Sequence, residues 1–240
     1  MTLVLNGAAG AMGLELQKLA VQKGLQAVLV DAKGGEGIYT DFSQVTENCD
    51  LVIDFSFHTA TAAAVNYAVR HKIPLVVGTT GHTEEEKREI LSSAKHIPLF
   101  YTGNMSLGIA VLCKLVKDAA RFFPDADIEI VETHHNRKAD APSGTALMLA
   151  RAAAEVRPEA EFHCGRAGVG KRQKQEIGIS SLRLGNVVGI HEVHISTGTQ
   201  TITLKHEAHD RALFAQGAME AAQFLLGKAP GHYDMDDLVK

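Results

Sequence analysis

Short runs of consecutive apolar residues alternate with segments of helical spacing through the first hundred residues. Helices are expected at residues 11–23 and 58–71, and after Thr83, whose hydroxyl can cap a helix with three glutamates in its first turn. The apolar runs predict strands at residues 3–5, 27–30, 51–53, 74–77 and 99–101. Continuously apolar strands separated by helices are typical of a parallel sheet covered on both faces. We therefore expect an α/β domain with a doubly wound parallel sheet.

The pattern beyond residue 104 predicts further helices around a new strand. Strand 127–133 precedes a helix that starts at Ser143 or Thr145 and ends near residue 156. A final helix at 211–226 is expected to return to the first domain. The first helix of this half spans residues 106–123 and carries apolar residues at Leu107, Val111, Leu115 and Ala119.

Three β-branched runs, at residues 177–184, 187–196 and 199–206, are separated by very short polar loops. Gly185–Asn186 and Thr197–Gly198 suit two-residue hairpin loops. We therefore expect an antiparallel meander, and an α+β second domain with an open mixed or antiparallel sheet. The two domains would comprise residues 1–104 with 212–240, and residues 105–211.

Segment 162–175 is basic and rich in glycine, and it lacks hydrophobic periodicity. We expect a surface loop there. A lid over a bound ligand is the alternative.

Composition excludes several classes of protein. With 240 residues, 45% of them hydrophobic and 22% charged, the chain can bury a sizeable core. A net charge of -4 argues against a nucleic-acid partner. No run approaches the roughly 18 apolar residues of a membrane span, and no signal peptide is evident. Cys49, Cys113 and Cys164 are too far apart for a metal site and indicate reduced thiols in a cytoplasmic protein.

The segment VLNGAAGAMG places Gly7, Gly10 and Gly13 between a strand and a helix. Such a turn lets the backbone approach a pyrophosphate, and the helix start supplies amide donors, as in Rossmann-like domains. Asp31, at the end of the next strand, lies where an acid binds the adenosine ribose. The alternative is a tight turn in an α/β protein that binds no nucleotide. Asp31 favours NAD(H), because a carboxylate repels a 2′-phosphate, whereas the ammonium group of Lys33 could reach that phosphate and keeps NADP(H) as a second candidate.

Two polar loops follow later strands of the same predicted sheet. Gly78-Thr79-Thr80-Gly81 and Thr102-Gly103-Asn104-Met105 both lie at the carboxyl edge, where open sheets bind ligands. They could line the nicotinamide half of a cofactor. Each segment taken alone is better explained as an ordinary loop.

The segment ETHHNRKADAPSGTA concentrates groups that protonate and bind anions. His134 and His135 end a strand and point in opposite directions unless the chain turns, and Lys138 follows on a loop. Ser143-Gly144-Thr145 offers amides and hydroxyls at a helix start, which suits a carboxylate. A positioned acid contributes roughly 10²–10⁴ in rate. A polar loop with a capping serine is the simpler alternative.

These motifs resemble those of the 4-hydroxy-tetrahydrodipicolinate reductase (dihydrodipicolinate reductase) family, which acts in the diaminopimelate route to lysine. The resemblance covers essentially the whole chain: the glycine turn, GTTG, the HHNRKADAPSGTA block, SLRLG and a closing YDMDDL. The histidine block is highly specific, whereas the glycine turn alone is not.

Membership of this family implies that a nicotinamide cofactor in the first domain delivers hydride to a cyclic, conjugated imine dicarboxylate in the second. By motif match His134 is the proton donor or acceptor, Lys138 is a further proton donor, and His135 binds substrate. Gly144 and Thr145 hold a carboxylate. Family members are usually homotetramers joined through the open sheet of the second domain, and domain closure brings the two ligands together.

The resemblance also implies which residues contact the cofactor. They are Gly7, Ala8, Ala9, Gly10, Ala11, Met12, Asp31, Gly78, Thr79, Thr80, Thr102, Gly103, Asn104 and Met105. Ala11 and Ala32 stand where the family often has arginine, and losing both cations strengthens the preference for NAD(H).

Other polar residues receive no role. His191 and His194 would face opposite sides of a strand, and His206 and His209 lack supporting ligands, so we expect no metal site. Arg183 should face the same side as Ile177 and Ile179, and its role stays open. Two other functions remain: a dehydrogenase of another small dicarboxylate, and a non-catalytic NAD-sensing regulator, which would not need His134 and Lys138 together.

Overall fold

The computed structural model describes residues 1–240, which divide into two compact units. Unit 1 comprises Met1–Leu107 and Arg211–Lys240, and unit 2 comprises Gly108–Asp210. None of the helices combines the length and apolar character that a membrane crossing requires.

Unit 1 is built on a seven-stranded sheet with the order β12-β6-β5-β4-β1-β2-β3, in which every pair of neighbours is parallel. Its central strands are almost fully buried, as their continuous apolar runs predicted. The strands are β1 (Thr2–Asn6), β2 (Gln26–Val30), β3 (Ile38–Tyr39), β4 (Leu51–Asp54), β5 (Leu75–Val77), β6 (Pro98–Tyr101) and β12 (Gly231–Tyr233). The predicted doubly wound parallel sheet is confirmed.

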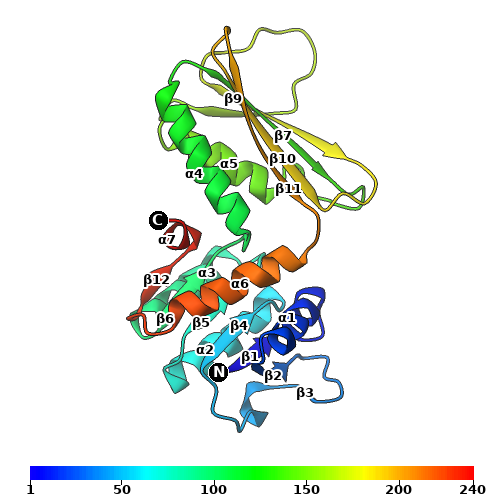
Figure 1. Ribbon diagram of the computed structural model, residues 1–240, viewed down its shortest axis with the longest axis vertical. Helices are drawn as coiled ribbons and strands as arrows, with labels where there is room; N and C mark the ends of the chain where they lie inside the picture. The colour runs from blue at the N-terminus through cyan, green and yellow to red at the C-terminus, as the bar shows by residue number, and fades with distance from the viewer. The chain divides into compact units, whose positions relative to one another are not determined.

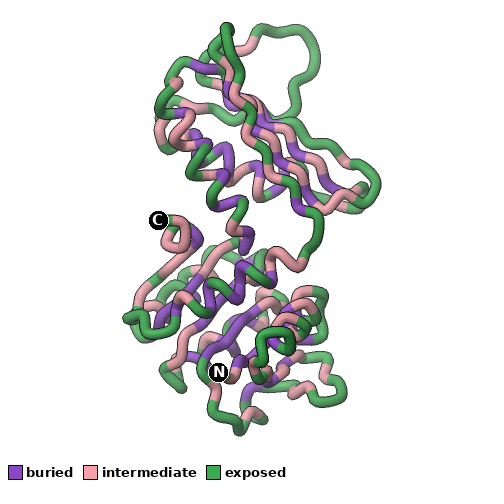
Figure 2. The backbone as a smooth tube through the Cα atoms, viewed as in Figure 1, coloured by how far each residue is buried: buried purple, intermediate pink, exposed green.

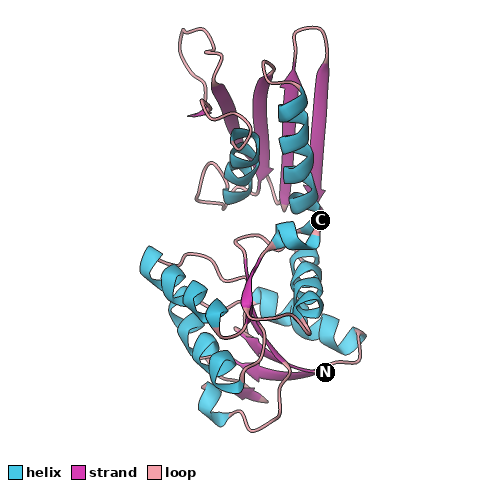
Figure 3. Cartoon of the chain, turned by 90° about the vertical axis from the view of Figure 1, so that its left-hand side faces the viewer, coloured by secondary structure: helices cyan, strands magenta, loops and turns pink.

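Helices cover both faces of this sheet (Figures 1 and 3). On one face α1 packs on α6, and on the other α2 packs on α3. Thr83 caps α3 as predicted, because its hydroxyl accepts a hydrogen bond from the amide of Glu86. The helices are α1 (Ala11–Gln22), α2 (Thr61–His71), α3 (Glu84–Ser92), α6 (Ala212–Leu225) and α7 (Met235–Leu238), with 3-10 turns at Phe42–Gln44, His58–Ala60 and Ser93–Lys95.

Unit 2 is a five-stranded mixed sheet with the order β11-β10-β7-β9-β8. Both of its helices, α4 (Leu107–Phe122) and α5 (Gly144–Ala154), lie on one face (Figures 1 and 3). Buried residues alternate with partly exposed ones along β7 and β10 (Figure 2), so one face of the sheet holds the core. The strands are β7 (Asp127–His134), β8 (Glu161–Cys164), β9 (Glu176–Arg183), β10 (Gly189–Ser196) and β11 (Thr201–Ala208).

The predicted three-stranded meander is wrong in one half. The loop after Ser196 does join antiparallel β10 and β11, but Gly185–Asn186 does not close a hairpin. Strand β7 lies between β9 and β10, and it pairs parallel with β9 and antiparallel with β10. The chain passes the end of β7, where the amide of Leu184 donates to the carbonyl of His134 at 2.8 Å. The turn residues Gly185–Asn186 therefore predicted a hairpin between β9 and β10, but β7, which is distant in sequence, pairs with both strands instead.

The apolar stripe that we expected on the first helix of this half is not the one buried. Val111 and Leu115 are exposed, whereas α4 buries Ile109, Leu112, Val116 and Ala120 against the sheet. The helix is apolar on more than one face, so spacing alone could not identify the side that packs.

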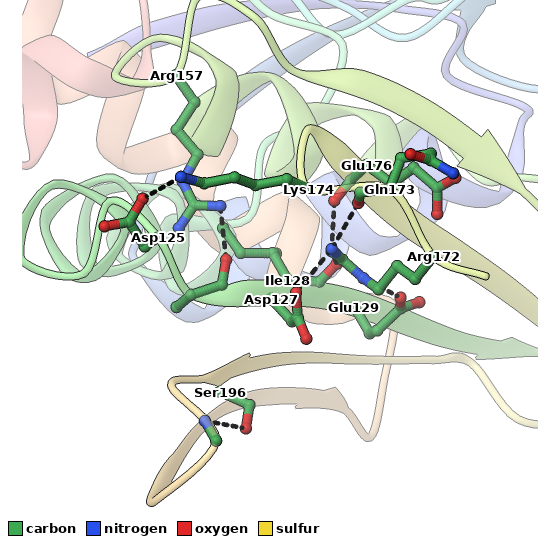
Figure 4. A network of polar contacts seen from close by, with 12 residues as sticks. Asp125, Asp127, Ile128, Glu129, Arg157, Arg172, Gln173, Lys174, Glu176 and Ser196 are labelled. Carbon is green, nitrogen blue, oxygen red and sulfur yellow. Dashed lines mark hydrogen bonds and ion pairs between the residues drawn. The ribbon is translucent and has the colours of Figure 1, made fainter.

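The basic segment at 162–175 begins with strand β8, which the sequence did not predict. Its later part is held against the start of β7 by Arg172, which pairs with Asp127 at 2.7 Å and with Glu129 at 3.3 Å (Figure 4). Lys174 pairs with Asp125 at 2.7 Å in the same network.

The close packing of Gly217 in α6 against the backbone of Met105 can be tested by substitution. A Cβ atom added at Gly217 would lie 1.8 Å from the carbonyl oxygen of Met105, and backbone cannot move aside cheaply. Helix propensity favours alanine over glycine by about 1 kcal/mol. We nevertheless expect Gly217→Ala to lower the free energy of unfolding by at least about 2 kcal/mol. Urea unfolding measures this, with the exposed neighbour Gln216→Ala as control; equal stability of the two variants would contradict the packing.

Candidate active site

The glycine turn follows β1 and leads directly into α1. Gly7 has a positive φ of 83°, and a Cβ atom there would lie 2.3 Å from the carbonyl oxygen of Phe55. A Cβ atom at Gly13 would lie 2.3 Å from the carbonyl oxygen of Gly7. The first position therefore needs glycine for its conformation, and both need it for close backbone packing.

Asp31 lies across this turn at the end of β2. Its carboxylate accepts hydrogen bonds from the amides of Ala9, at 3.0 Å, and Lys33, at 2.9 Å. A cavity of about 290 Å³ opens beside the turn, and its lining includes Gly7, Gly10, Asp31, Lys33 and Ser56. Glycine backbone at the wall of a cavity, of which Gly10 is exposed, and a nearby carboxylate are what a dinucleotide requires, so these residues fit that cofactor.

The other predicted cofactor residues differ in how accessible they are. Ala9, Ala11 and Thr80 are exposed, and Met12 and Gly78 are partly exposed. Ala8, Thr79 and Met105 are buried, so the side chains of Ala8 and Met105 belong to the core. Thr102 and Asn104 shape their own turn, since the hydroxyl of Thr102 accepts from the amide of Asn104 at 3.2 Å.

A second polar cluster lies at the end of β7 in unit 2. Strand alternation puts Glu132 and His134 on the helix-covered face, and Nδ1–H of His134 donates to Oε2 of Glu132 at 2.5 Å. Arg183, on the neighbouring strand β9, donates to both carboxylate oxygens of Glu132 at 2.9 Å. The amide of Ser143 donates to Oε1 at 3.1 Å. Arg183 does face the side of Ile177 and Ile179, and its role is to bind this carboxylate.

The Glu132 carboxylate is fully buried and ionised. Burial raises its pKa, but the hydrogen bonds from His134, Arg183 and Ser181 together outweigh burial and hold the pKa well below its ordinary range. The bond from Nδ1 of His134 fixes the ring, so that Nε2 is the nitrogen left to exchange a proton.

Ser143 connects this cluster to the start of α5. Its hydroxyl accepts a hydrogen bond from the amide of Ala146 and lies 3.2 Å from Nε2 of His191. Burial, together with repulsion from His134, lowers the pKa of His191 to about 4, so the ring is neutral near pH 7. Ser143 is buried, whereas Gly144 is exposed and Thr145 partly exposed at the first turn of the helix.

His135 and Lys138 leave β7 on the loop that leads to α5. The ammonium group of Lys138 pairs with Asp140 at 2.8 Å. The hydrogen bond from Lys138 holds the pKa of Asp140 below its ordinary value. Arg183 also donates to the backbone carbonyl of Asp140 at 2.6 Å, so the loop is tied to the buried carboxylate.

Comparison with known proteins places both units in one family. Family models described as dihydrodipicolinate reductase, N-terminus and C-terminus, match residues 1–105 and 108–239. The chain is 44% identical over 245 residues to the 4-hydroxy-tetrahydrodipicolinate reductase of Caldanaerobacter subterraneus subsp. tengcongensis, covering 99% of this chain and 98% of that one. It is 41% identical over 244 residues to that of Alkaliphilus metalliredigens, covering 100% and 99%. The chain belongs to the dihydrodipicolinate reductase family.

Solved structures agree on the fold. A dipicolinate-bound dihydrodipicolinate reductase from Paenisporosarcina sp. TG-14 has a TM-score of 0.80 and 22% identity, covering 98% of this chain and 97% of that one. GenD2 from gentamicin A biosynthesis, in complex with NAD, has a TM-score of 0.63 and 10% identity over 100% of this chain and 90% of that one.

As a dihydrodipicolinate reductase, the protein is an oxidoreductase of lysine biosynthesis that reduces 4-hydroxy-tetrahydrodipicolinate with NADH or NADPH. The sequence alone indicates no role for Glu132 or His191 and leaves that of Arg183 open. Glu132 could have been found, because it stands two residues before His134 and therefore on the same face of the strand. The register that brings Arg183 and His191 beside it had no signal in the sequence.

Removing the charge of Glu132 tests the cluster. We expect Glu132→Gln to lower the free energy of unfolding by about 3 kcal/mol at pH 7, because Arg183 loses its bidentate partner. The folded-state pKa of Glu132 is depressed, so this stabilisation is present above its unfolded pKa of about 4.3 and is lost as pH falls below it. Urea unfolding of both proteins at several pH values measures the difference.

Glu161→Gln is the matched control for this change, since Glu161 is exposed on β8 of the same sheet. We expect that control to leave stability within about 0.5 kcal/mol. A difference between Glu132→Gln and the native protein that stays constant down to pH 3 would contradict the buried, ionised carboxylate.

Proposed function

We propose that the enzyme binds its cofactor in unit 1 and its dicarboxylate substrate in unit 2, with His134 as the proton donor or acceptor and Lys138 as a further proton donor. The single observation that carries this proposal is the buried Glu132 carboxylate bound to Nδ1 of His134. The hydrogen bond to Glu132 occupies Nδ1 of His134 and leaves Nε2 for the substrate. A sensor that only bound nucleotide would have no use for this arrangement.

In this proposal unit 2 supplies protons for the reaction and positive charge for the substrate carboxylates. When bound, the nicotinamide cofactor supplies the hydride. Conversion of the 4-hydroxy-tetrahydro compound to the tetrahydro compound also removes the hydroxyl group. This group takes up a proton and leaves as water. His134, the last residue of β7, and Lys138, on the loop between β7 and α5, are the side chains that we propose as proton donors. A positioned acid contributes roughly 10²–10⁴ in rate.

The substrate carboxylates are assigned to the first turn of α5 and to His135. Gly144 and Thr145 are accessible there, and the helix N-terminus favours an anion. The hydroxyl group of Ser143 accepts a hydrogen bond from the amide of Ala146 and contacts Nε2 of His191. We therefore assign Ser143 the role of shaping the carboxylate site rather than that of binding the ligand through its hydroxyl group. The dipicolinate bound by the Paenisporosarcina enzyme is a dicarboxylate of the same kind.

NADH is the preferred cofactor in this proposal, with NADPH as a second one. The Asp31 carboxylate faces the cavity beside the glycine turn, and Ala11 and Ala32 offer no cation to a 2′-phosphate. Lys33 also lines the cavity, and its ammonium group provides one cation for the 2′-phosphate of NADPH. NADPH therefore binds as well, with lower affinity than NADH. The cofactor contacts are proposed at the turn from Gly7 to Met12, at Asp31, and at the loops after β5 and β6.

The uncovered face of the unit 2 sheet is the proposed homotetramer interface. Alternation places Val131 and Ile190 on that face, and Leu182 is 52% exposed there. None of Cys49, Cys113 and Cys164 forms a disulfide, and we propose a reducing compartment such as the cytoplasm.

Substitutions in unit 2 test the division of roles. We expect His134→Gln and Lys138→Ala each to reduce kcat by roughly 10²–10⁴, because each removes a proton donor. The Kd for NADH, measured by fluorescence titration, should stay within about twofold of the native value, which is less than 0.5 kcal/mol. Loss of NADH binding in either variant would refute the assignment of cofactor and substrate to separate units.

Asp31 tests the cofactor preference. We expect the native enzyme to have a higher kcat/KM with NADH than with NADPH, and Asp31→Asn to shrink that ratio by about tenfold, or about 1.4 kcal/mol, because the repulsion of a 2′-phosphate is lost. Glu36→Gln removes an equal charge from an exposed residue outside the cavity and is the control. An unchanged ratio in Asp31→Asn would show that Asp31 does not discriminate.

A further inference from the structure

A second buried carboxylate, Asp54, lies in unit 1 at the end of β4. It is 0% exposed and accepts four hydrogen bonds from side chains. Asn6 donates to Oδ1 at 2.7 Å and Ser56 at 2.6 Å. Thr61 donates to Oδ2 at 2.7 Å and Thr79 at 2.8 Å. No positive charge is among these partners, so the carboxylate is stabilised by neutral donors alone.

Each hydroxyl group has one proton to donate, which fixes the donor and the acceptor in the hydrogen bonds of Thr61 and Thr79. The single hydroxyl proton of Thr61 goes to Asp54, so the Thr61 oxygen must accept from Nε2–H of His82, 2.9 Å away. The hydroxyl of Thr79 likewise donates to Asp54 and accepts from the amide of Ser56 at 2.9 Å. Burial lowers the pKa of His82, which keeps this ring neutral. Each of the two threonine hydroxyls therefore donates to Asp54 and accepts from a neighbouring N–H group.

The four donors come from four different segments around the cofactor cavity. Asn6 ends β1 and immediately precedes Gly7 of the glycine turn, while Ser56 follows β4. Thr61 opens α2, and Thr79 belongs to the loop after β5. Asn6 and Ser56 line the cavity of about 290 Å³ beside the turn, whereas Asp54 does not.

Stability alone does not explain a buried charge of this kind. Replacing buried ion pairs by apolar residues is often neutral or stabilising, and in some proteins buried polar groups serve instead to specify one arrangement. Loop positions at the carboxyl edge of a parallel sheet are otherwise held by few contacts, and Asp54 joins them to the rigid strands on either side.

We propose that Asp54 is a positioning residue for the nicotinamide cofactor: it holds the glycine turn, the segment after β4 and the loop after β5 in the arrangement that binds the dinucleotide, without touching it. This inference rests on the proposed binding of the cofactor in unit 1. A merely structural role would change stability and leave cofactor affinity unaltered.

The experiment measures the Kd for NADH by fluorescence titration, together with thermal unfolding, for Asp54→Asn and Thr61→Val. Asparagine presents an amide group to four donors, and valine keeps the shape of threonine without its hydroxyl. We expect each change to weaken NADH binding at least about tenfold, equivalent to about 1.4 kcal/mol. Thr61→Ser, which keeps the hydroxyl group, should restore most of that loss.

Thr59→Val is the matched control, because Thr59 is exposed and is not one of the four donors to the Asp54 carboxylate. Its Kd should stay within about twofold of the native value. Asp54→Asn and Thr61→Val proteins that are folded at the assay temperature and bind NADH as the native enzyme does would overturn the proposal. If Asp54→Asn does not fold, the pair Thr61→Val and Thr61→Ser decides. Native protein that binds neither NADH nor NADPH would instead refute the proposed function itself.

Discussion

The hydrogen bonds of the buried Glu132 carboxylate are the interaction on which the polar cluster of unit 2 depends. They join three segments that are distant in sequence: β7 with His134, β9 with Arg183, and the start of α5 with Ser143. An ionised carboxylate without water is costly unless all of its oxygens are occupied, and here each oxygen accepts at least two hydrogen bonds. The same contacts that offset burial therefore orient the His134 imidazole and shape the helix start beside it.

Unit 1 uses a related arrangement at the carboxyl edge of its parallel sheet. Parallel strands bring the ends of β1, β2, β4 and β5 to one edge, so short loops from each can contribute to one cavity. Asp31 accepts a hydrogen bond from the amide of Ala9 in the glycine turn, and Asp54 accepts hydrogen bonds from side chains of the neighbouring segments. In both units a carboxylate that accepts from several segments gives irregular loops a defined geometry.

Local signals in the sequence were sufficient for most of the elements and for the accessible polar residues. The glycine turn, the Thr83 cap and the His134–Lys138 loop each follow from residues close together in the chain. Features that depend on distant pairing were not predictable in this way. The insertion of β7 between β9 and β10, the buried stripe of α4, and the contact of Arg183 with Glu132 are set by which surfaces meet in the folded sheet.

The most direct test of this account is a crystal structure of the enzyme soaked with pyridine-2,6-dicarboxylate, a planar dianion related to the substrate. We expect one carboxylate of the ligand at the amides of Gly144 and Thr145, with Nε2 of His134 facing the ring and Nδ1 still bound to Glu132. A dianion bound away from His134, or a His134 ring turned away from Glu132 in the complex, would contradict it.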